Sequence, residues 1–232
     1  PIDRWRPILK DYKHALHLFV SMFSLLPISD KFFDLVDWYG HNVFKHKNFV
    51  EEVDALATLS GFPFGKLFFL NFMYEFSTIK ACSGILIRNY AGKILHGRNL
   101  DFEMWGMISH LLVNIDYYQG KKLVYSVDTV VGSVFALTGI RHGAFAINCD
   151  TRKGKDILSD ITSVFWYDAI PNVWLLRKIL EEEVTYKNAL DRLLTTRIAA
   201  PIYYVISGVE GNEGAVIERD PDGVHGCYYL TK

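Results

Sequence analysis

One stretch of the chain, residues 81–102, predicts a sharp reversal of an extended backbone. An apolar first arm is followed by a turn sequence at 89–92 and by a second arm that ends in Arg98 and Asp101. Glycine is a natural turn residue, and two strand-like arms around such a turn predict a β-hairpin. A hairpin brings its ends together, so we expect Cys82, at the start of the first arm, to lie near Arg98 and Asp101.

This arrangement has two interpretations. A nearby cation favours a thiolate, and a carboxylate can orient a proton carrier, so Cys82 beside Arg98 and Asp101 would be a candidate nucleophile. The structural alternative is a buried strand cysteine next to a surface ion pair. Spacing alone leaves both interpretations open.

Composition limits the class of protein. The chain has 232 residues, of which 50% are hydrophobic and 15% aromatic, which suits one large globular domain or two tightly joined layers. The net charge of −1 gives no reason to expect nucleic acid as a partner. Three cysteines without metal-binding spacing make a disulfide framework, a zinc site and a cofactor unexpected. Because the chain begins with Pro1, we expect a processed or trimmed product.

The first third of the chain is predicted to be helical. Apolar residues recur at helical spacing, and Ser29-Asp30 offers a helix start. The helix expected at 11–26 is apolar on an unusually wide face, which indicates either a helix packed on two sides or one that contacts lipid. The longest apolar run, residues 18–28, is too short for a membrane span, which needs about 20 apolar residues. The predicted helices are 11–26, 31–39, 49–59 and 64–76.

After Cys82 the pattern becomes strand-like and then mixed. Gln119-Gly120-Lys121 predicts a second hairpin, and Thr138-Gly139 is interpreted as a turn. Pro171 is expected at the first position of a helix and Thr185 as a helix cap. Helices, then antiparallel strands, predict a layered α+β domain. The further strands expected are 111–118, 123–130, 134–137, 144–149, 202–207 and 215–218, and the further helices are 161–170, 172–183 and 185–195.

The run 96–101, His-Gly-Arg-Asn-Leu-Asp, follows Cys82-Ser83-Gly84 and is the most specific motif of the chain. Together with several further segments, it resembles one family, the acid ceramidases and N-acylethanolamine acid amidases, which are N-terminal-nucleophile (Ntn) cysteine hydrolases. The resemblance spans nearly the whole chain and favours the acid ceramidase branch. It extends to Arg4-Trp5 and to residues 63–66, 70–75, 137–139, 200–204 and 214–220.

This resemblance implies a four-layer αββα sandwich made as one precursor. The precursor would cut itself between Ala81 and Cys82. Residues 1–81 would become a helical small subunit and residues 82–232 the catalytic subunit, which together form an α/β heterodimer.

The resemblance also implies the chemistry. The freed α-amino group of Cys82 would take the thiol proton, Arg98 would act electrostatically on the sulfur, and Asp101 would hold the new amine. The substrate would be a lipid amide, a ceramide or an N-acylethanolamine, with Trp105 and Phe135 as candidates for binding its acyl chain. His96 and Asn99 are expected to be supporting residues. The implied setting is a lysosome or another acidic compartment, with possible lipid-surface contact through the N-terminal helices.

The match departs from the family pattern at two places. Thr151 stands where the family carries a glutamate, and the adjacent Asp150 is expected to point to the opposite face of the strand. We therefore expect that Asp150 could replace the glutamate only if the backbone shifts. The family's active-site asparagine and a following arginine belong to a region after Lys232. A non-catalytic lipid-binding relative is therefore the alternative function, and a choloylglycine-type or penicillin-type amidase is a related enzyme option.

Overall fold

The structure, a computed structural model, describes residues 1–23, 28–72, 74, 80–102, 105–152 and 169–231. The chain divides into two compact units. One unit comprises Pro1–Tyr74, Met104–Val113 and Val130–Val134, and the other comprises Glu75–Glu103, Asn114–Thr129 and Phe135–Lys232. The chain passes between the units several times, so neither unit is one continuous segment.

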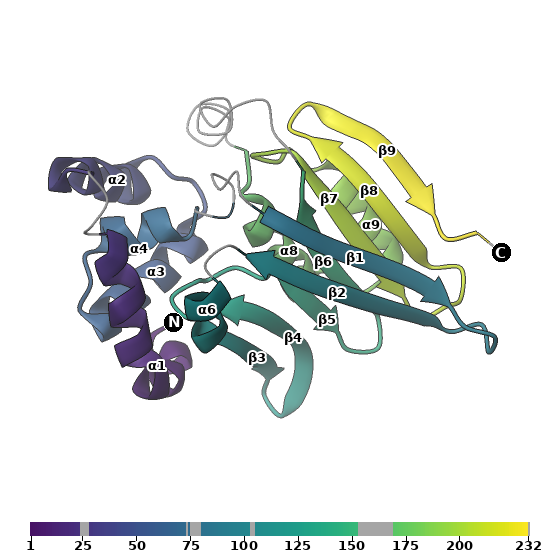
Figure 1. Cartoon of the computed structure of the whole chain (residues 1–232), viewed down its shortest axis with the longest axis horizontal. Helices are drawn as coiled ribbons and strands as arrows, with labels where there is room; N and C mark the ends of the chain where they lie inside the picture. Colours follow the sequence, from purple (N-terminus) through teal and green to yellow (C-terminus); the bar gives the residue numbers. More distant parts are fainter. Residues whose placement is uncertain (24–27, 73, 75–79, 103–104, 153–168, 232) are drawn as a thin grey trace. The chain divides into compact units, whose positions relative to one another are not determined.

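The first unit is helical, and the four helices expected in the first third of the chain are confirmed. The first begins at Ile2 rather than at Asp11, and the fourth ends at Leu70 rather than at residue 76. Asn71 follows that end, and its side-chain amide donates to the carbonyls of Leu67 and Gly132. The elements are α1 (Ile2–Phe23), α2 (Asp30–Asn42), α3 (Lys47–Ser60), α4 (Phe64–Leu70), α6 (Trp105–Ile108) and the 3₁₀ turn η1 (Ser109–Leu111) (Figure 1).

A core of aromatic rings joins these helices. Their rings meet mostly edge to face, at centroid distances between 5.0 and 5.7 Å, which is a favourable geometry for aromatic pairs. The Arg4-Trp5 pair has a structural role here, because both side chains contact the buried carboxylate of Glu52. The aromatic residues are Phe44, Phe49, Phe64, Phe68 and Phe72.

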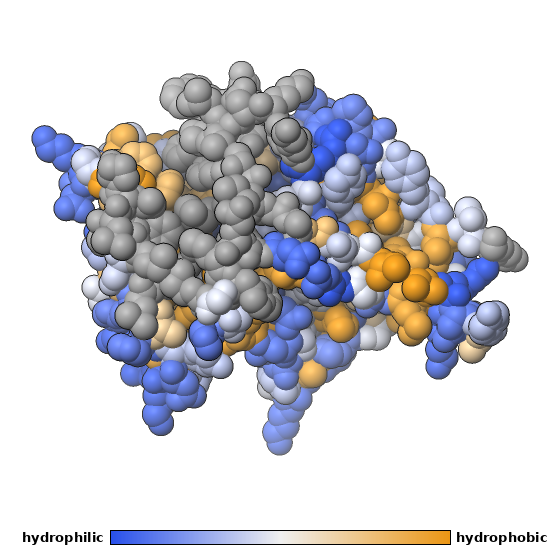
Figure 2. Space-filling model, viewed as in Figure 1, coloured by the Kyte–Doolittle hydropathy of each residue, from blue (hydrophilic) through white to orange (hydrophobic). Residues whose placement is uncertain are grey.

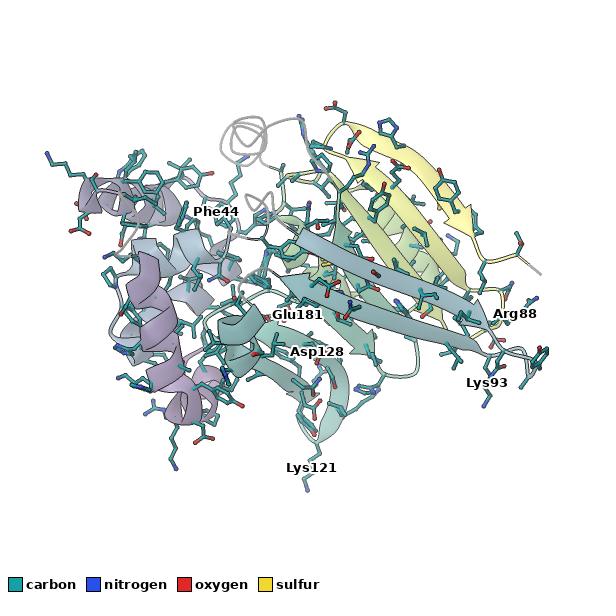
Figure 3. All side chains as sticks on the ribbon, in the orientation of Figure 1. Phe44, Arg88, Lys93, Lys121, Asp128 and Glu181 are labelled. Carbon is teal, nitrogen blue, oxygen red and sulfur yellow. The ribbon has the colours of Figure 1, made fainter. Side chains whose placement is uncertain are left out.

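The predicted hairpin is confirmed as β1 (Lys80–Arg88) and β2 (Ile94–Phe102), paired antiparallel without a bulge. The backbone N–H of Gly92, whose φ is +77°, donates to the Asn89 carbonyl and closes the turn. Figure 3 labels Arg88 and Lys93 at this turn end. Cys82 lies at the opposite end of the hairpin.

A seven-stranded antiparallel sheet forms the centre of the second unit, with its strands in chain order from β3 to β9. The strand expected at 134–137 is wrong: these residues are irregular and buried, and the next strand begins at Thr138, where a turn was expected. The last strand was not predicted. The strands are β3 (Leu112–Gln119), β4 (Lys122–Val130), β5 (Thr138–Arg141), β6 (Phe145–Thr151), β7 (Ile202–Gly208), β8 (Gly214–Asp220) and β9 (Gly223–Tyr229).

Two helices, α8 (Asn172–Glu182) and α9 (Tyr186–Thr195), follow in the same unit. The predicted cap at Thr185 is confirmed, because its hydroxyl accepts a hydrogen bond from the Asn188 N–H. Pro171 is extended, with ψ of 134°, and so precedes α8 as its cap residue instead of occupying the first helical position. The helix expected at 161–170 lies almost wholly outside the described residues.

The second unit is layered, and the α+β class is confirmed. α8 and α9 pack on one face of the seven-stranded sheet, while β1 and β2 contact β6 and β7 on the other (Figure 1). The outer face of the hairpin exposes Ile85, Ile87 and Leu95, visible as an apolar area in Figure 2. Across the described ranges, no helix has the length and apolar character needed to cross a bilayer.

Candidate active site

Cys82 and Arg98 lie on the same face of the hairpin. In the register Cys82 pairs with Leu100 and Gly84 with Arg98, and side chains two apart on a strand share a face. The alternate residues on the two strands, Ser83 on β1 and Asn99 on β2, are exposed. The face that carries Cys82 and Arg98 is therefore turned towards the seven-stranded sheet. Nη2 of Arg98 donates a hydrogen bond to Sγ of Cys82 at 3.8 Å. The expectation that the hairpin brings these two residues together is confirmed.

Neutral acceptors fix the guanidinium of Arg98. Its Nη1 donates to the hydroxyl of Thr138 at 2.6 Å, and its Nη2 donates to the backbone carbonyl of Cys149 at 3.0 Å. Thr138 opens β5 and Cys149 lies in β6, so the sheet presents both acceptors. The sequence alone did not indicate Thr138, because its place at the start of a strand was interpreted as a turn.

Asp150 is the carboxylate beside this guanidinium. Its Oδ1 lies 3.6 Å from Nε of Arg98, and both side chains are about nine-tenths buried, with exposures of 8% for Arg98 and 9% for Asp150. Burial raises the pKa of Asp150, although Arg98, Asn148 and the backbone N–H of Gly84 act in the opposite direction. Gly84 permits this close packing, since a Cβ there would lie 2.8 Å from Oδ2 of Asp150.

A hydrogen-bonded chain extends from Asp150 through the interior. Nδ2 of Asn148 donates to Asp150 at 2.9 Å, which leaves Oδ1 of Asn148 as the acceptor from Nε2 of His96 at 2.6 Å. Nδ1 of His96 then accepts from the hydroxyl of Ser207 at 2.9 Å. Burial lowers the pKa of His96, and the charge of Arg98 lowers it further despite the contact with Asn148. The chain is thus consistent with a neutral imidazole protonated on Nε2.

Asp101 lies on the other face of the hairpin. Its carboxylate is exposed and accepts a hydrogen bond from Nδ2 of Asn99 at 2.8 Å. Its register partner is Ala81, the residue that precedes Cys82. The structure therefore places Asp101 beside the Ala81–Cys82 peptide but does not direct its carboxylate to the thiol.

Known proteins of similar sequence share this region and most of the chain. No family model matches. The N-acylethanolamine-hydrolyzing acid amidase of Caenorhabditis elegans is 27% identical over 241 aligned residues, which cover 100% of this chain and 68% of that protein. Mouse acid ceramidase is 28% identical over 263 aligned residues, covering 100% of this chain and 66% of the relative.

A solved structure, that of the Caenorhabditis elegans N-acylethanolamine-hydrolyzing acid amidase ortholog, matches with a TM-score of 0.60 at 28% identity. The match covers 65% of this chain and 64% of that one. The chain is therefore similar, over its whole length, to acid ceramidases and N-acylethanolamine acid amidases. It spans about two thirds of the length of these relatives.

The remaining site candidates from the family resemblance are Asp150, Thr151, Phe135 and Trp105. Asp150 faces Arg98 in a regular stretch of β6, without the backbone shift that we expected it to need, whereas the neighbouring Thr151 faces the other side of the sheet. Phe135 is buried. Trp105 begins α6, but its side chain, like that of Ala81, lies outside the described residues. In the described parts of the chain no three His, Cys, Asp or Glu side chains are grouped to hold a metal ion.

Proposed function

We propose that this chain belongs to the acid ceramidase and N-acylethanolamine acid amidase family and hydrolyses the amide bond of a lipid amide, with Cys82 as the nucleophile. The observation that carries the proposal is the 3.8 Å contact between the Cys82 sulfur and the Arg98 guanidinium, within a run that resembles the family motif. A fixed cation beside a sulfur stabilises negative charge on it, which is what a nucleophilic cysteine needs. The names of the relatives point to ceramides or N-acylethanolamines as substrates.

The proposed reaction begins with maturation of the chain. Cleavage of the Ala81–Cys82 peptide frees the α-amino group of Cys82, and residues 1–81 and 82–232 become the two subunits. Asp101, the register partner of Ala81, is well placed to accept a hydrogen bond from the new amine. In its neutral form that amine accepts the thiol proton, so nucleophile and base belong to one residue and need no separate alignment.

Amide hydrolysis then takes two steps. The Cys82 thiolate attacks the amide carbonyl, the carbon–nitrogen bond breaks, and the leaving amine takes the proton held by the α-amino group. Water then attacks the thioester and gives one proton to the α-amino group; the carbon–sulfur bond breaks, the proton passes to the departing thiolate, and the fatty acid is released. Trp105 and Phe135 remain the proposed contacts of the acyl chain, and an acidic compartment such as the lysosome the proposed setting.

Two measurements on one set of variants test this proposal. The full chain is incubated at acid pH, run on a denaturing gel, and assayed with a fluorogenic fatty amide. We expect two fragments split before Cys82, and hydrolysis that Cys82→Ala lowers at least about a thousandfold, as loss of a nucleophile does in other enzymes. The matched control is Cys227→Ala, a half-buried cysteine on β9, which should leave both readouts unchanged.

One result would favour the alternative function instead. A single uncut band together with fatty-amide turnover no faster than that of Cys82→Ala would mark the chain as a lipid-binding relative without hydrolase activity. Binding of the fatty amide, measured by quenching of tryptophan fluorescence, would then be retained.

A further inference from the structure

Arg98 has two kinds of partner, and they differ in charge. Both η nitrogens are held by neutral oxygens, the hydroxyl of Thr138 and the carbonyl of Cys149. The ε nitrogen faces the carboxylate of Asp150. A change in the charge of Asp150 therefore leaves the two bonds that aim the guanidinium in place.

The sulfur and the carboxylate compete for the same cation. Arg98 lies 3.8 Å from Sγ of Cys82 and 3.6 Å from Oδ1 of Asp150, so the two groups are about equally close. In a buried site the electrostatic interaction between two charges at such a distance is strong, because little solvent screens it. An ionised Asp150 offsets part of the positive charge at Cys82, and a protonated Asp150 does not.

We propose, on the basis of the proposed role of Cys82 as nucleophile, that Asp150 tunes the charge that Arg98 presents to the sulfur. In the same arrangement Asn148 and His96 are positioning residues, which hold an N–H of Asn148 on the Asp150 carboxylate. The amide of Asn148 is locked in this orientation, because its oxygen is occupied by Nε2–H of the neutral His96. Ser207 fixes the other side of the imidazole.

The surroundings of Asp150 allow its charge to change under mildly acidic conditions. Burial raises the pKa of Asp150, so it takes up a proton at a higher pH than an ordinary carboxylate. Among the described residues, the titratable groups that face it come from β6 and from the strands that pair with β6 or pack against it. They are Cys82 on β1, His96 and Arg98 on β2, Tyr203 opposite it on β7, and Arg152 on β6, which is itself paired with Glu218 and Asp220 of β8.

The test measures the thiol of Cys82 and needs no turnover. The full chain reacts with 2,2′-dipyridyl disulfide between about pH 4 and pH 8, a range that spans the titration of a raised carboxylate. The modified peptide is quantified by mass spectrometry, with the Cys227 peptide as internal reference. We expect the wild-type rate to show an additional acid-side inflection that Asp150→Asn removes. At neutral pH Asp150→Asn should react roughly threefold to tenfold faster, because position 150 then no longer offsets the charge of Arg98.

A double-variant cycle separates charge from folding. In an Arg98→Gln background, Asp150→Asn should no longer change the rate, because the cation through which Asp150 acts is gone. An acid-side inflection that persists in Asp150→Asn, or an Asp150→Asn effect of the same size without Arg98, would overturn the assignment.

The positioning pair is tested by rescue. His96→Leu frees the Asn148 amide to turn its oxygen to Asp150, so the inflection should move to higher pH. His96→Gln should restore it, because a glutamine can donate to Asn148 and accept from Ser207. If both variants lower the melting temperature but leave the inflection where it is, the pair is only structural and this part of the inference is wrong.

The outcomes also separate this inference from the proposed function. A normal inflection in a chain that never hydrolyses an amide would refute the proposed function and leave the Asp150 assignment standing. Hydrolysis that depends on Cys82, with an inflection unaffected by Asp150→Asn, would support the proposed function and refute the Asp150 assignment.

Discussion

Arg98 donates a hydrogen bond to the sulfur of Cys82 across the inner face of a two-stranded hairpin, at 3.8 Å. The two residues are 16 positions apart in the chain, and their contact is partly buried. The register places Arg98 opposite Gly84, one side chain along the same face from Cys82. The chemistry proposed for this chain depends on that contact, and so does the first prediction.

Replacement of Arg98 by glutamine should slow hydrolysis of a fluorogenic fatty amide by roughly 100-fold, the effect typical of losing one preorganised donor to developing negative charge. Arg98→Lys should recover only part of this loss, because an ammonium cannot reach Thr138, the Cys149 carbonyl and the sulfur together. Arg88→Gln, at the turn end of the same hairpin, is the matched control and should keep full activity. Equal activity in Arg98→Gln and wild type would contradict the proposed site.

Gly84→Ala should lower the free energy of unfolding by about 1–3 kcal/mol, the usual cost of overpacking. The added methyl group would lie 2.7 Å from Cγ2 of Val205 and 2.8 Å from Oδ2 of Asp150, in a packed interior. Gly97→Ala is the control on the neighbouring strand: its methyl group meets only the side chain of Ile85, which is exposed and can move. Urea denaturation of both variants measures the difference, and equal stabilities would show that the hairpin does not pack as closely as described.

Arg219→Leu should destabilise the second unit by about 1–3 kcal/mol, the cost of leaving buried acceptors without donors. Arg219 is buried, and its guanidinium donates to the carbonyls of Leu193 and Thr196 at the end of α9 and to that of Gly223. The comparison is with Lys187→Leu, on the exposed side of α9, which should shift the urea midpoint little. No difference between the two variants would mean that the end of α9 is stable without this arginine.

His41 should make the helical unit more stable in mild acid. Burial lowers its pKa, but the hydrogen bonds that its ring donates to the carboxylates of Asp54 and Asp37 outweigh this and raise the pKa of His41 overall. A raised folded-state pKa contributes stability that is fully present below about pH 6.5, the ordinary histidine value, and is lost as the pH rises through the raised value. Because His41 is 38% exposed, solvent screening limits this contribution to a few tenths of a kcal/mol.

The measurement is the stability difference between wild type and His41→Gln as a function of pH. It should be larger in mild acid than at alkaline pH, while the packing of the ring on Phe64 contributes equally at both. A difference that is constant with pH would show that the two carboxylates do not act on the charged imidazole.

The sequence predicted the part of the site that local interactions along the chain determine. The β1–β2 hairpin follows from an apolar arm, a glycine turn and a second arm, and these local features sufficed to bring Cys82 and Arg98 together. We expected Asp101 to lie near Cys82 together with Arg98, but the alternation of side chains along a strand predicts otherwise. Arg98 and Asp101 are three residues apart and so point to opposite sides of the hairpin.

The rest of the site depends on packing between sheets. Which of Asp150 and Thr151 faces the hairpin is decided by how β6 lies beneath it, and no local pattern indicates that choice. The residues 134–137 are apolar because they are buried, and not because they form a strand. The strand β9 escaped prediction because it is half exposed and its pairing with β8 shifts register between Glu218 and Arg219, so its apolar pattern is weak.

The central claim is that Cys82 carries the acyl group. The most direct measurement is to mix the cleaved protein with a fatty amide, quench with acid within one turnover, digest, and map the added acyl mass by mass spectrometry. The account predicts a thioester on the peptide that begins with Cys82, absent from Cys82→Ala and removed by hydroxylamine. Turnover of the amide with an acyl group on any other residue, or with none on Cys82, would contradict it.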